Sequence, residues 1–312
     1  MLAAEPIMNR EIRVGIIGLS VHSADFTEIL NGETATDKMS GCRVVSIYHP
    51  KGNDDVEFSG QQLDKFTQTI KAHGVNFVSS IDAVVDQSDA VMLLTNDGRP
   101  HVKQVLPVFQ AGKPVFIDKP LADTLRNVQA IFKASNQYGV PLFSSSALRY
   151  GKTVQDIGQG KSVGKVLGAN VYGPAPLQPS HVDLFWDGIH AVETLFTVMG
   201  RGCQWVSRSH SANSDIVVGS WTGDRLGIVR GIRGGRAGFG GTAYGASGIT
   251  PIGGFQGYGP LVESIVDFFR MKDPPVSMEE TLEIYAFMEA ADESKRQGGA
   301  RVNLSDVLAQ VN

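Results

Sequence analysis

A lysine between an acid and a proline is the first group in this sequence with the type and setting for catalysis. The segment Asp118-Lys119-Pro120 follows the short apolar run 115–117, which suits a buried strand. In an open α/β sheet, ligands bind at the carboxyl ends of the strands. Pro120 also favours extended backbone at the residue before it. Lys119 is therefore predicted to project from a strand tip, where its ammonium group could orient a substrate oxygen. An ordinary surface lysine in a loop is the alternative.

A histidine about 70 residues further along is the second candidate. His190 lies in the first turns of a predicted helix, 189–199, whose N-terminal dipole opposes positive charge. A neutral imidazole can accept a proton near neutral pH. A single histidine on a helix is, however, more often structural than catalytic. Glu193 adds only one further ligand one turn away, which is too few for a metal site, so no bound metal is expected.

The turn after the first strand predicts a phosphate-binding site of altered type. That strand ends in Gly18, and a helix is predicted over 24–30. In a dinucleotide fold, the second and third glycines of G-x-G-x-x-G admit the pyrophosphate and allow close helix packing. Here Ser20 and Ser23 replace those glycines, and His22 lies between them. Serine can cap the helix or donate its hydroxyl to phosphate. The alternative is a turn that no longer binds a dinucleotide tightly.

The second strand, 44–48, ends without the acid that many dinucleotide enzymes use for the ribose hydroxyls. His49, Pro50 and Lys51 follow it. Either these residues form an ordinary turn, or His49 or Lys51 accommodates a 2′-phosphate, which would favour NADP over NAD. Both interpretations stay open from the residues alone.

Several of these segments together resemble the Gfo/Idh/MocA family of nicotinamide-dependent sugar and inositol dehydrogenases. Asp118-Lys119-Pro120 is similar to the family's Glu-Lys-Pro signature, with Asp in place of Glu, and the stretch 274–299 is similar to the family's C-terminal segment. The resemblance implies an NAD or NADP cofactor, with Lys119 beside the nicotinamide and the substrate hydroxyl. The residues expected to bind the cofactor are Gly18, Ser20, His22, Ser23, His49, Thr95, Asn96, His101, Asp118 and Lys119.

Two of these positions carry their own alternative or motif. Thr95 and Asn96, after the predicted strand 90–94, and His101 resemble the family's threonine, variable loop and histidine near the nicotinamide ribose. A histidine that packs locally at the start of the next helix is the alternative for His101.

The substrate side of the site is implied by a second family element. Gly188-Ile189-His190 is similar to the family's Gly-x-His, which implies that His190 assists proton transfer. The family's preceding acid is replaced by Trp186, so Asp187 is the expected catalytic partner of Lys119 and His190, and Asp183 a substrate-binding residue beside them. Arg149 resembles the family's arginine before an aromatic residue near the substrate. An interdomain salt bridge is the alternative for Arg149.

The rhythm of the predicted elements divides the chain near residue 150. Strands and helices alternate before it, which indicates a parallel sheet, here a Rossmann domain over 13–150. After it, one long strand, a helix and several glycine-punctuated strands predict an α+β domain over 151–312, built on a largely antiparallel open sheet. Residues 1–12 are expected to form a flexible tail, and the helix over 278–297 is expected to pack back on the first domain.

Composition excludes several classes of partner. The chain has 312 residues and a formal net charge of −4, which argues against a nucleic-acid or anionic-membrane partner. No apolar run approaches a membrane span, and two cysteines in different predicted domains fit a reducing cytoplasm. Because an exposed sheet face needs cover, a homodimer or homotetramer is expected.

Three functions follow from the sequence. The first is an oxidoreductase that moves hydride between a nicotinamide cofactor and a secondary alcohol of a sugar, cyclitol or related polyol. The second is a glycosidase or epimerase of the same family that uses bound nicotinamide transiently. The third is a non-catalytic sugar-binding protein, which the altered phosphate turn and the missing ribose acid both favour.

Overall fold

A computed structural model describes residues 11–33 and 35–310 of the chain. The chain divides into two compact units. The described parts of unit 1 are 11–33, 35–121, 130–144 and 258–276, and those of unit 2 are 122–129, 145–257 and 277–310. The expected tail lies outside the described residues except for its last two positions, and Ile12 already begins the first strand.

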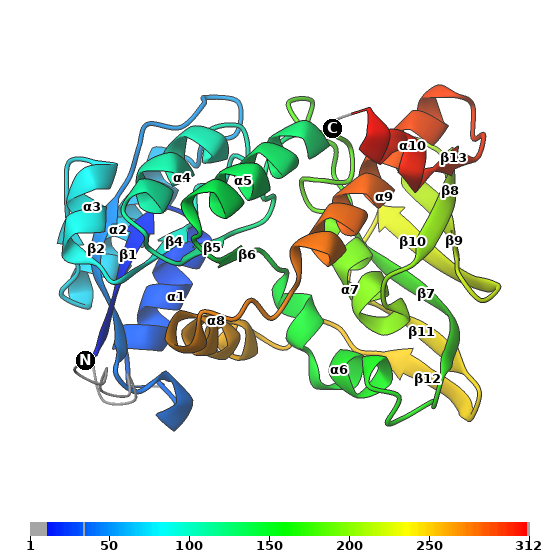
Figure 1. Ribbon diagram of the computed structural model, residues 1–312, viewed down its shortest axis with the longest axis horizontal. Coiled ribbons are helices and arrows are strands. Elements are labelled where there is room, and N and C mark those ends of the chain that lie inside the picture. The colour runs from blue at the N-terminus through cyan, green and yellow to red at the C-terminus, as the bar shows by residue number, and fades with distance from the viewer. Residues whose placement is uncertain (1–10, 34, 311–312) are drawn as a thin grey trace. The chain divides into compact units, whose positions relative to one another are not determined.

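Unit 1 is built on a sheet of six parallel strands in the order β3-β2-β1-β4-β5-β6, which is the strand order of a Rossmann domain (Figure 1). The strands are β1 (Ile12–Ile17), β2 (Cys42–Tyr48), β3 (Asn76–Phe77), β4 (Ala90–Leu93), β5 (Val115–Ile117) and β6 (Leu142–Phe143). The central strands β4 and β5 are buried along their whole length. This burial explains why they are continuous apolar runs without alternation. The predicted Rossmann domain is confirmed.

The helices of unit 1 cover this sheet in two groups. They are α1 (Val21–Asn31), α2 (Gly60–Ala72), α3 (Ile81–Gln87), α4 (His101–Gln110), α5 (Leu125–Tyr138) and α8 (Gly259–Met271), with the short helix η2 (Asp37–Met39). Helix α1 contacts both α2 and α8, whereas α3 contacts α4. The division between the units falls within α5, because its first residues belong to unit 2.

Unit 2 is built on a seven-stranded sheet in the order β12-β11-β7-β10-β9-β8-β13. Its strands are β7 (Val166–Pro174), β8 (Cys203–His210), β9 (Ser214–Trp221), β10 (Arg225–Ile232), β11 (Gly240–Gly245), β12 (Gly248–Ile252) and β13 (Val302–Asn303). Neighbouring strands are antiparallel except β7 and β10, which pair in parallel. The expected largely antiparallel sheet is confirmed, with this one parallel pair.

One face of this sheet is covered by helices. The helices of unit 2 are α6 (Lys152–Gly158), α7 (Ile189–Met199), α9 (Met278–Arg296) and α10 (Leu304–Ala309), with the short helix η3 (Ala147–Tyr150). Helix α7 packs on β7 and β10, and α9 packs on β8. Trp221, Phe196 and Phe287 form the aromatic centre of this core. The helices therefore place the first turn of α7 over a rigid sheet.

Strand β12 and helix α9 both lie in the C-terminal part of unit 2. Strand β12 contains Pro251 and lies at the sheet edge, where proline is tolerated. Helix α9, which was expected to pack back on the first domain, packs along β8 within unit 2, and that expectation stays a prediction. Helix α8, from the C-terminal part of the chain, belongs to unit 1.

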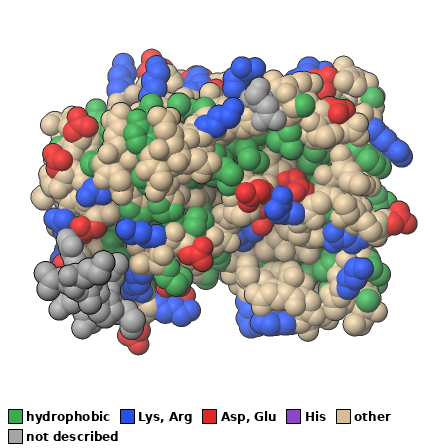
Figure 2. Space-filling view, viewed as in Figure 1, with side chains coloured by type: hydrophobic (Ala, Val, Ile, Leu, Met, Phe, Trp, Pro, Cys, Tyr) green, Lys and Arg blue, Asp and Glu red, His purple; other side chains and the backbone are tan. Residues whose placement is uncertain are grey.

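The surface carries charges of both signs. Figure 2 shows lysine and arginine side chains interspersed with acidic ones over the visible face, rather than gathered into a basic patch. Nucleic-acid binding proteins need such a patch. Among the described residues, no helix is long and apolar enough to cross a membrane.

Candidate active site

The carboxyl edge of the unit 1 sheet brings together the residues expected to bind a cofactor. Gly18 follows β1, His49 follows β2, Thr95 follows β4, and Asp118 follows β5. Gly18 has a φ of 105°, and a Cβ there would lie 2.3 Å from the backbone nitrogen of Thr95. Only glycine fits this close approach of two strand ends. The first position of the fingerprint is therefore kept for a physical reason.

The two serines of the altered turn close the start of α1. The Ser20 hydroxyl accepts a hydrogen bond from the Ser23 N–H, and the Ser23 hydroxyl accepts one from the Ser20 N–H, which forms a capping box. The Ser23 hydroxyl also donates to the Gly18 carbonyl oxygen at 3.0 Å. Helix α1 consequently begins three residues earlier than expected. Both hydroxyls are used inside the turn, which keeps its shape without the second and third glycines.

His22 turns away from the start of the helix and joins two other segments of unit 1. Its Nδ1 lies 2.5 Å from Asp118 Oδ2, and its Nε2 lies 3.1 Å from the Tyr258 hydroxyl. The ring stacks on Phe26 with 5.3 Å between centroids. His22 therefore connects the phosphate turn to the lysine motif through its side chain, and its predicted contact with a cofactor stays a prediction.

Asp118 fixes the backbone of the lysine that follows it. Its Oδ1 accepts the Lys119 N–H at 2.8 Å, and its Oδ2 faces His22. Burial favours the neutral acid, but the His22 and Lys119 charges and hydrogen bonds outweigh it and lower the pKa of Asp118. An ionised carboxylate thus lies at the strand tip beside Lys119. The shorter side chain of Asp, in place of the family's Glu, is sufficient for this contact.

A clasp of polar contacts holds the loop after β2 against the loop after β4. Asn53 donates to Asp97, Asn96 donates to the Val56 carbonyl oxygen at 3.4 Å, and Arg99 pairs with Asp55 at 2.6 Å. These contacts join two loops that lie far apart in the sequence.

The clasp encloses a hollow at the edge of the sheet, lined by Gly18, Leu19, His49, Glu57, Thr95 and Asn96 among others, with about 280 Å³ of empty space including its open mouth. His49 Nδ1 is buried without a hydrogen-bond partner, and its Nε2 lies 3.9 Å from Glu57 Oε2. Ser20, His22 and Ser23 do not line this hollow. It therefore combines a glycine, an unsatisfied ring nitrogen and a carboxylate.

His101 contacts the backbone of two loops at the carboxyl edge of the unit 1 sheet. It is fully buried at the start of α4, with Nε2 2.9 Å from the Thr95 carbonyl oxygen and Nδ1 3.1 Å from that of Leu121. Burial lowers the pKa of His101, although the two carbonyl oxygens oppose that shift. The Thr95 hydroxyl donates to Gln104 at 2.8 Å. His101 joins the loops that carry Thr95 and Lys119, and its predicted contact with a cofactor stays a prediction.

In unit 2, His190 lies half-buried in the first turn of α7 and has a defined partner. Its Nδ1 lies 2.7 Å from the Ser146 hydroxyl. The Phe239 ring packs edge-on against the imidazole at 5.7 Å. The His190 N–H donates to the Asp187 carbonyl oxygen at 3.1 Å. Asp187 therefore meets His190 through its backbone, and its predicted catalytic role stays a prediction.

Glu193 and Arg149 form a buried ion pair under this histidine. Arg149 Nε lies 3.0 Å from Glu193 Oε2, and Arg149 Nη1 lies 2.7 Å from Glu280. Burial raises the pKa of Glu193, although Arg149 and two hydrogen bonds from the serine segment oppose that shift. Burial also works against the charged Arg149, but Glu193 and Glu280 outweigh it and raise its pKa. Arg149 thus forms its salt bridges within unit 2, and its Nη2 is buried without a partner.

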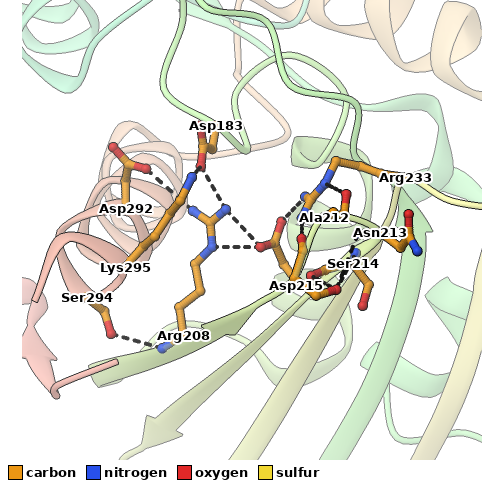
Figure 3. A network of polar contacts seen from close by, with 11 residues as sticks. Asp183, Arg208, Ala212, Asn213, Ser214, Asp215, Arg233, Asp292, Ser294 and Lys295 are labelled. Carbon is orange, nitrogen blue, oxygen red and sulfur yellow. Dashed lines mark hydrogen bonds and ion pairs between the residues drawn. The ribbon is translucent and has the colours of Figure 1, made fainter. Parts of the chain in front are cut away.

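Asp183 belongs to a cluster of charges shown in Figure 3. Its Oδ2 lies 2.8 Å from Arg208 and 2.6 Å from Lys295. Burial opposes the charged form, but Lys295 and Arg208 lower the pKa of Asp183. Arg208 also binds Asp215, whose side chain is fully buried. The cluster fixes the segment before α7 to β8 and α9, and the predicted role of Asp183 in substrate binding stays a prediction.

Three residues of these sites were not predicted as functional. Ser146 follows β6, so the strand-end rule that selected Lys119 also applies to it. Glu57 lies in a loop with no regular spacing from any motif, and Tyr258 lies in a glycine-rich loop 236 residues from His22. Only the fold brings Glu57 and Tyr258 to these sites, and the sequence carries no local signal for either of them.

Residues 12–146 match the model of the Gfo/Idh/MocA oxidoreductases, a family with an NAD-binding Rossmann fold. The chain is thus similar to this family over somewhat less than half of its length. It is 27% identical over 141 residues to inositol 2-dehydrogenase of Rhodococcus erythropolis, a match that covers 45% of this chain and 37% of the relative. The match thus spans little more than a third of that relative's length.

Solved structures match this chain over nearly its whole length. Scyllo-inositol dehydrogenase of Lactobacillus casei, solved with NAD(H) and scyllo-inositol, gives a TM-score of 0.74 at 15% identity over 95% of this chain and 100% of that one. Myo-inositol 2-dehydrogenase of Lactobacillus plantarum gives 0.75 at 15% identity over 94% and 99%. At such low identity the likeness shows the fold.

The residues of unit 1 fit the dinucleotide that this family binds. Gly18 lines the hollow, and α1 begins shortly after it, as in folds that bind phosphate at a helix N-terminus. His49 lines the hollow, and its ring could contact a ribose hydroxyl there.

Proposed function

We propose that this chain belongs to the Gfo/Idh/MocA family and is an NAD(P)-dependent dehydrogenase that oxidises a secondary alcohol of a cyclitol or sugar. The observation that carries the proposal is the Asp118-Lys119 pair at the tip of β5, within the part of the chain that matches the family. The ionised Asp118 carboxylate holds the Lys119 backbone beside the strand ends where Rossmann domains bind ligands. The inositol dehydrogenases among its relatives support a cyclitol as the substrate class.

The cofactor would be held by residues of unit 1. Gly18 and the N–H groups at the start of α1 would bind the pyrophosphate, His49 and Glu57 the adenosine ribose, and Thr95 and Asn96 the nicotinamide half. A bound nicotinamide supplies an acceptor for hydride. The protein's part is to orient the substrate and to handle its proton.

Two side chains divide the work on the substrate. His190 takes the hydroxyl proton as general base, and Lys119 hydrogen-bonds to the same oxygen and stabilises its developing negative charge. Asp187 and Arg149 are proposed to assist at the substrate side. Asp183 is proposed to act on the substrate only through the segment that it anchors.

The test is a Lys119→Met variant beside a Lys113→Met control. Lys113 precedes β5 at the opposite end of the same strand. Turnover is followed as NADH or NADPH absorbance with myo-inositol, scyllo-inositol and glucose, and cofactor affinity by calorimetry. Lys119→Met should lower kcat by roughly a thousandfold or more, with a cofactor Kd within about threefold of wild type. Unchanged turnover would contradict the proposal.

The same experiment separates the other two functions. If neither NAD nor NADP binds more tightly than about 1 mM, the protein is a non-catalytic sugar-binding protein. If the cofactor binds but no reduced cofactor accumulates, a glycan-cleavage assay tests for a glycosidase. The intact capping box of Ser20 and Ser23 favours the dehydrogenase, because it keeps the turn in a shape that can bind phosphate.

We further propose a homodimer or homotetramer in the cytoplasm. The sheet of unit 2 exposes large apolar side chains, including Leu226 at 53% and Ile249 at 69%, and such a face is typical of a protein interface. The two buried free cysteines, Cys42 and Cys203, fit a reducing compartment.

A further inference from the structure

We infer that Ser146 is the positioning residue of His190: its hydroxyl sets the orientation of the imidazole through Nδ1 and leaves proton transfer to Nε2. The inference rests on the proposed dehydrogenase function. It answers a question raised by the sequence, because the acid that the family places near this histidine is Trp186 here.

The contact between the two side chains is short and internal to unit 2. Ser146 Oγ lies 2.7 Å from His190 Nδ1, and only 1% of Ser146 is exposed. Water therefore does not compete for this hydroxyl as it would for an exposed serine. The imidazole also packs against Phe239 in an edge-to-face contact, with 5.7 Å between the ring centroids. Serine and phenylalanine together restrict the tilt of the imidazole.

The serine and its neighbour Ser145 are themselves held by hydrogen bonds. Its hydroxyl accepts the Leu148 N–H at 3.2 Å as the cap of η3, and its own N–H donates to Glu193 Oε1 at 3.0 Å. The neighbouring Ser145 hydroxyl donates to Glu193 Oε2 at 3.0 Å. Arg149 in turn fixes that carboxylate. The buried ion pair thus holds the backbone that carries the histidine's partner.

A hydroxyl can serve both protonation states of the imidazole. It carries one donor and two acceptor sites, and the Leu148 N–H occupies one acceptor site. The second acceptor site can take an Nδ1–H, both in the neutral ring that is ready to act as a base and in the imidazolium that forms after it. In the other neutral tautomer, in which Nε2 carries the proton, the same hydroxyl can rotate and donate to Nδ1. A carboxylate in this place could only accept.

The proton moves in one balanced step. The substrate O–H bond breaks and its proton bonds to His190 Nε2. The hydrogen bond from Nδ1–H to Ser146 Oγ is kept throughout. The charged groups around the ring's partner are Glu193 and Arg149, which offset each other, and Asp187 lies less than one helical turn before the histidine.

The experiment compares Ser146→Ala with Ser144→Ala as the matched control. Ser144 is buried in the same serine run, and its hydroxyl has no hydrogen-bond partner. Ser146→Ala should lower kcat roughly tenfold to a hundredfold with KM within about threefold, which is the usual effect of losing the partner that orients a histidine. Ser144→Ala should stay within about threefold of wild type. Ser146→Thr, which keeps the hydroxyl, should restore most of the loss.

A second readout needs no turnover. Nitrogen NMR of the free protein, with His190 assigned from a His190→Gln variant, should show the Nδ1 resonance shifted in Ser146→Ala and unchanged in Ser144→Ala. An unchanged Nδ1 resonance overturns the inference, as does an equal kcat for the two alanine variants. If Ser146→Thr is as impaired as Ser146→Ala, the serine acts by packing alone and the inference is also wrong. Absence of any turnover in wild type would instead refute the proposed function, while the resonance would still report the contact.

Discussion

Replacing Asp215 with alanine should destabilise unit 2 more than any neighbouring charge deletion. The Asp215 side chain is fully buried and binds two guanidinium groups. Arg208 donates to Asp215 Oδ1 through Nε at 3.0 Å and Nη2 at 2.9 Å, and Arg233 contacts Oδ2 (Figure 3). Asp215→Ala leaves both cations without this carboxylate.

The size of the loss follows from what remains around each cation. Removing one partner of a buried ion pair costs about 3–5 kcal/mol. Arg208 keeps Asp183 at 2.8 Å and Asp292 at 3.4 Å, so its charge stays partly compensated. We therefore expect the lower end, about 3 kcal/mol. For a domain of roughly 150–250 residues this lowers Tm by about 6–12 °C.

Urea unfolding followed by tryptophan fluorescence measures this loss directly. All three tryptophans of the chain, Trp186, Trp205 and Trp221, lie in unit 2 and report on that unit. The control is Asp292→Ala, because Asp292 is partly exposed and farther from Arg208; it should cost about 1 kcal/mol or less. Equal losses for the two variants, or a loss below about 1 kcal/mol for Asp215→Ala, would refute the reasoning.

Three further outcomes are expected. The lowered pKa of Asp118 adds folding stability that is present above its ordinary pKa of 3.8 and is lost as pH falls through the folded-state value. In Asp118→Asn this loss of stability below about pH 5 should be smaller, as measured by hydrogen exchange of β5. Because Glu57 adds negative charge at the hollow, Glu57→Gln should raise affinity for NADP about tenfold relative to NAD in calorimetry, whereas Asp54→Asn, the same charge change outside the lining, should not; equal shifts would place the 2′-phosphate elsewhere. Leu226→Asp with Ile249→Lys should reduce the mass measured by light scattering to that of a monomer, and an unchanged mass would remove the unit 2 sheet as the interface.

The fold was largely predictable because its signals are local. Apolar runs such as 115–117 indicate buried parallel strands, and serine and glycine residues indicate where helices begin and end. β12 carries a weak local signal, because proline among glycines is typical of loops. The pairing of β7 with β10 in parallel has no local signal, since strand direction depends on how the chain returns.

The candidate site was only partly predictable for the same physical reason. Lys119 and His190 stand in short motifs that a sequence displays, whereas the partner of each ring or carboxylate is set by the fold. His22 and Asp118 are 96 residues apart, and Ser146 and His190 are 44 apart. Sequence spacing carries no information about such pairs, so the roles of these side chains become visible only in three dimensions.

The placement of the two cysteines allows the local opening of each unit to be measured separately. Cys42 is buried on β2 of unit 1 and Cys203 on β8 of unit 2. Burial raises the pKa of Cys42 to about 12 and also raises that of Cys203, so the reactive thiolate is rare in the folded state. An alkylating reagent can then modify either sulfur only while its surroundings open. Mass spectrometry of the two peptides would give the opening rate of each unit in one sample, and a ligand that slows one rate alone would reveal which unit it binds.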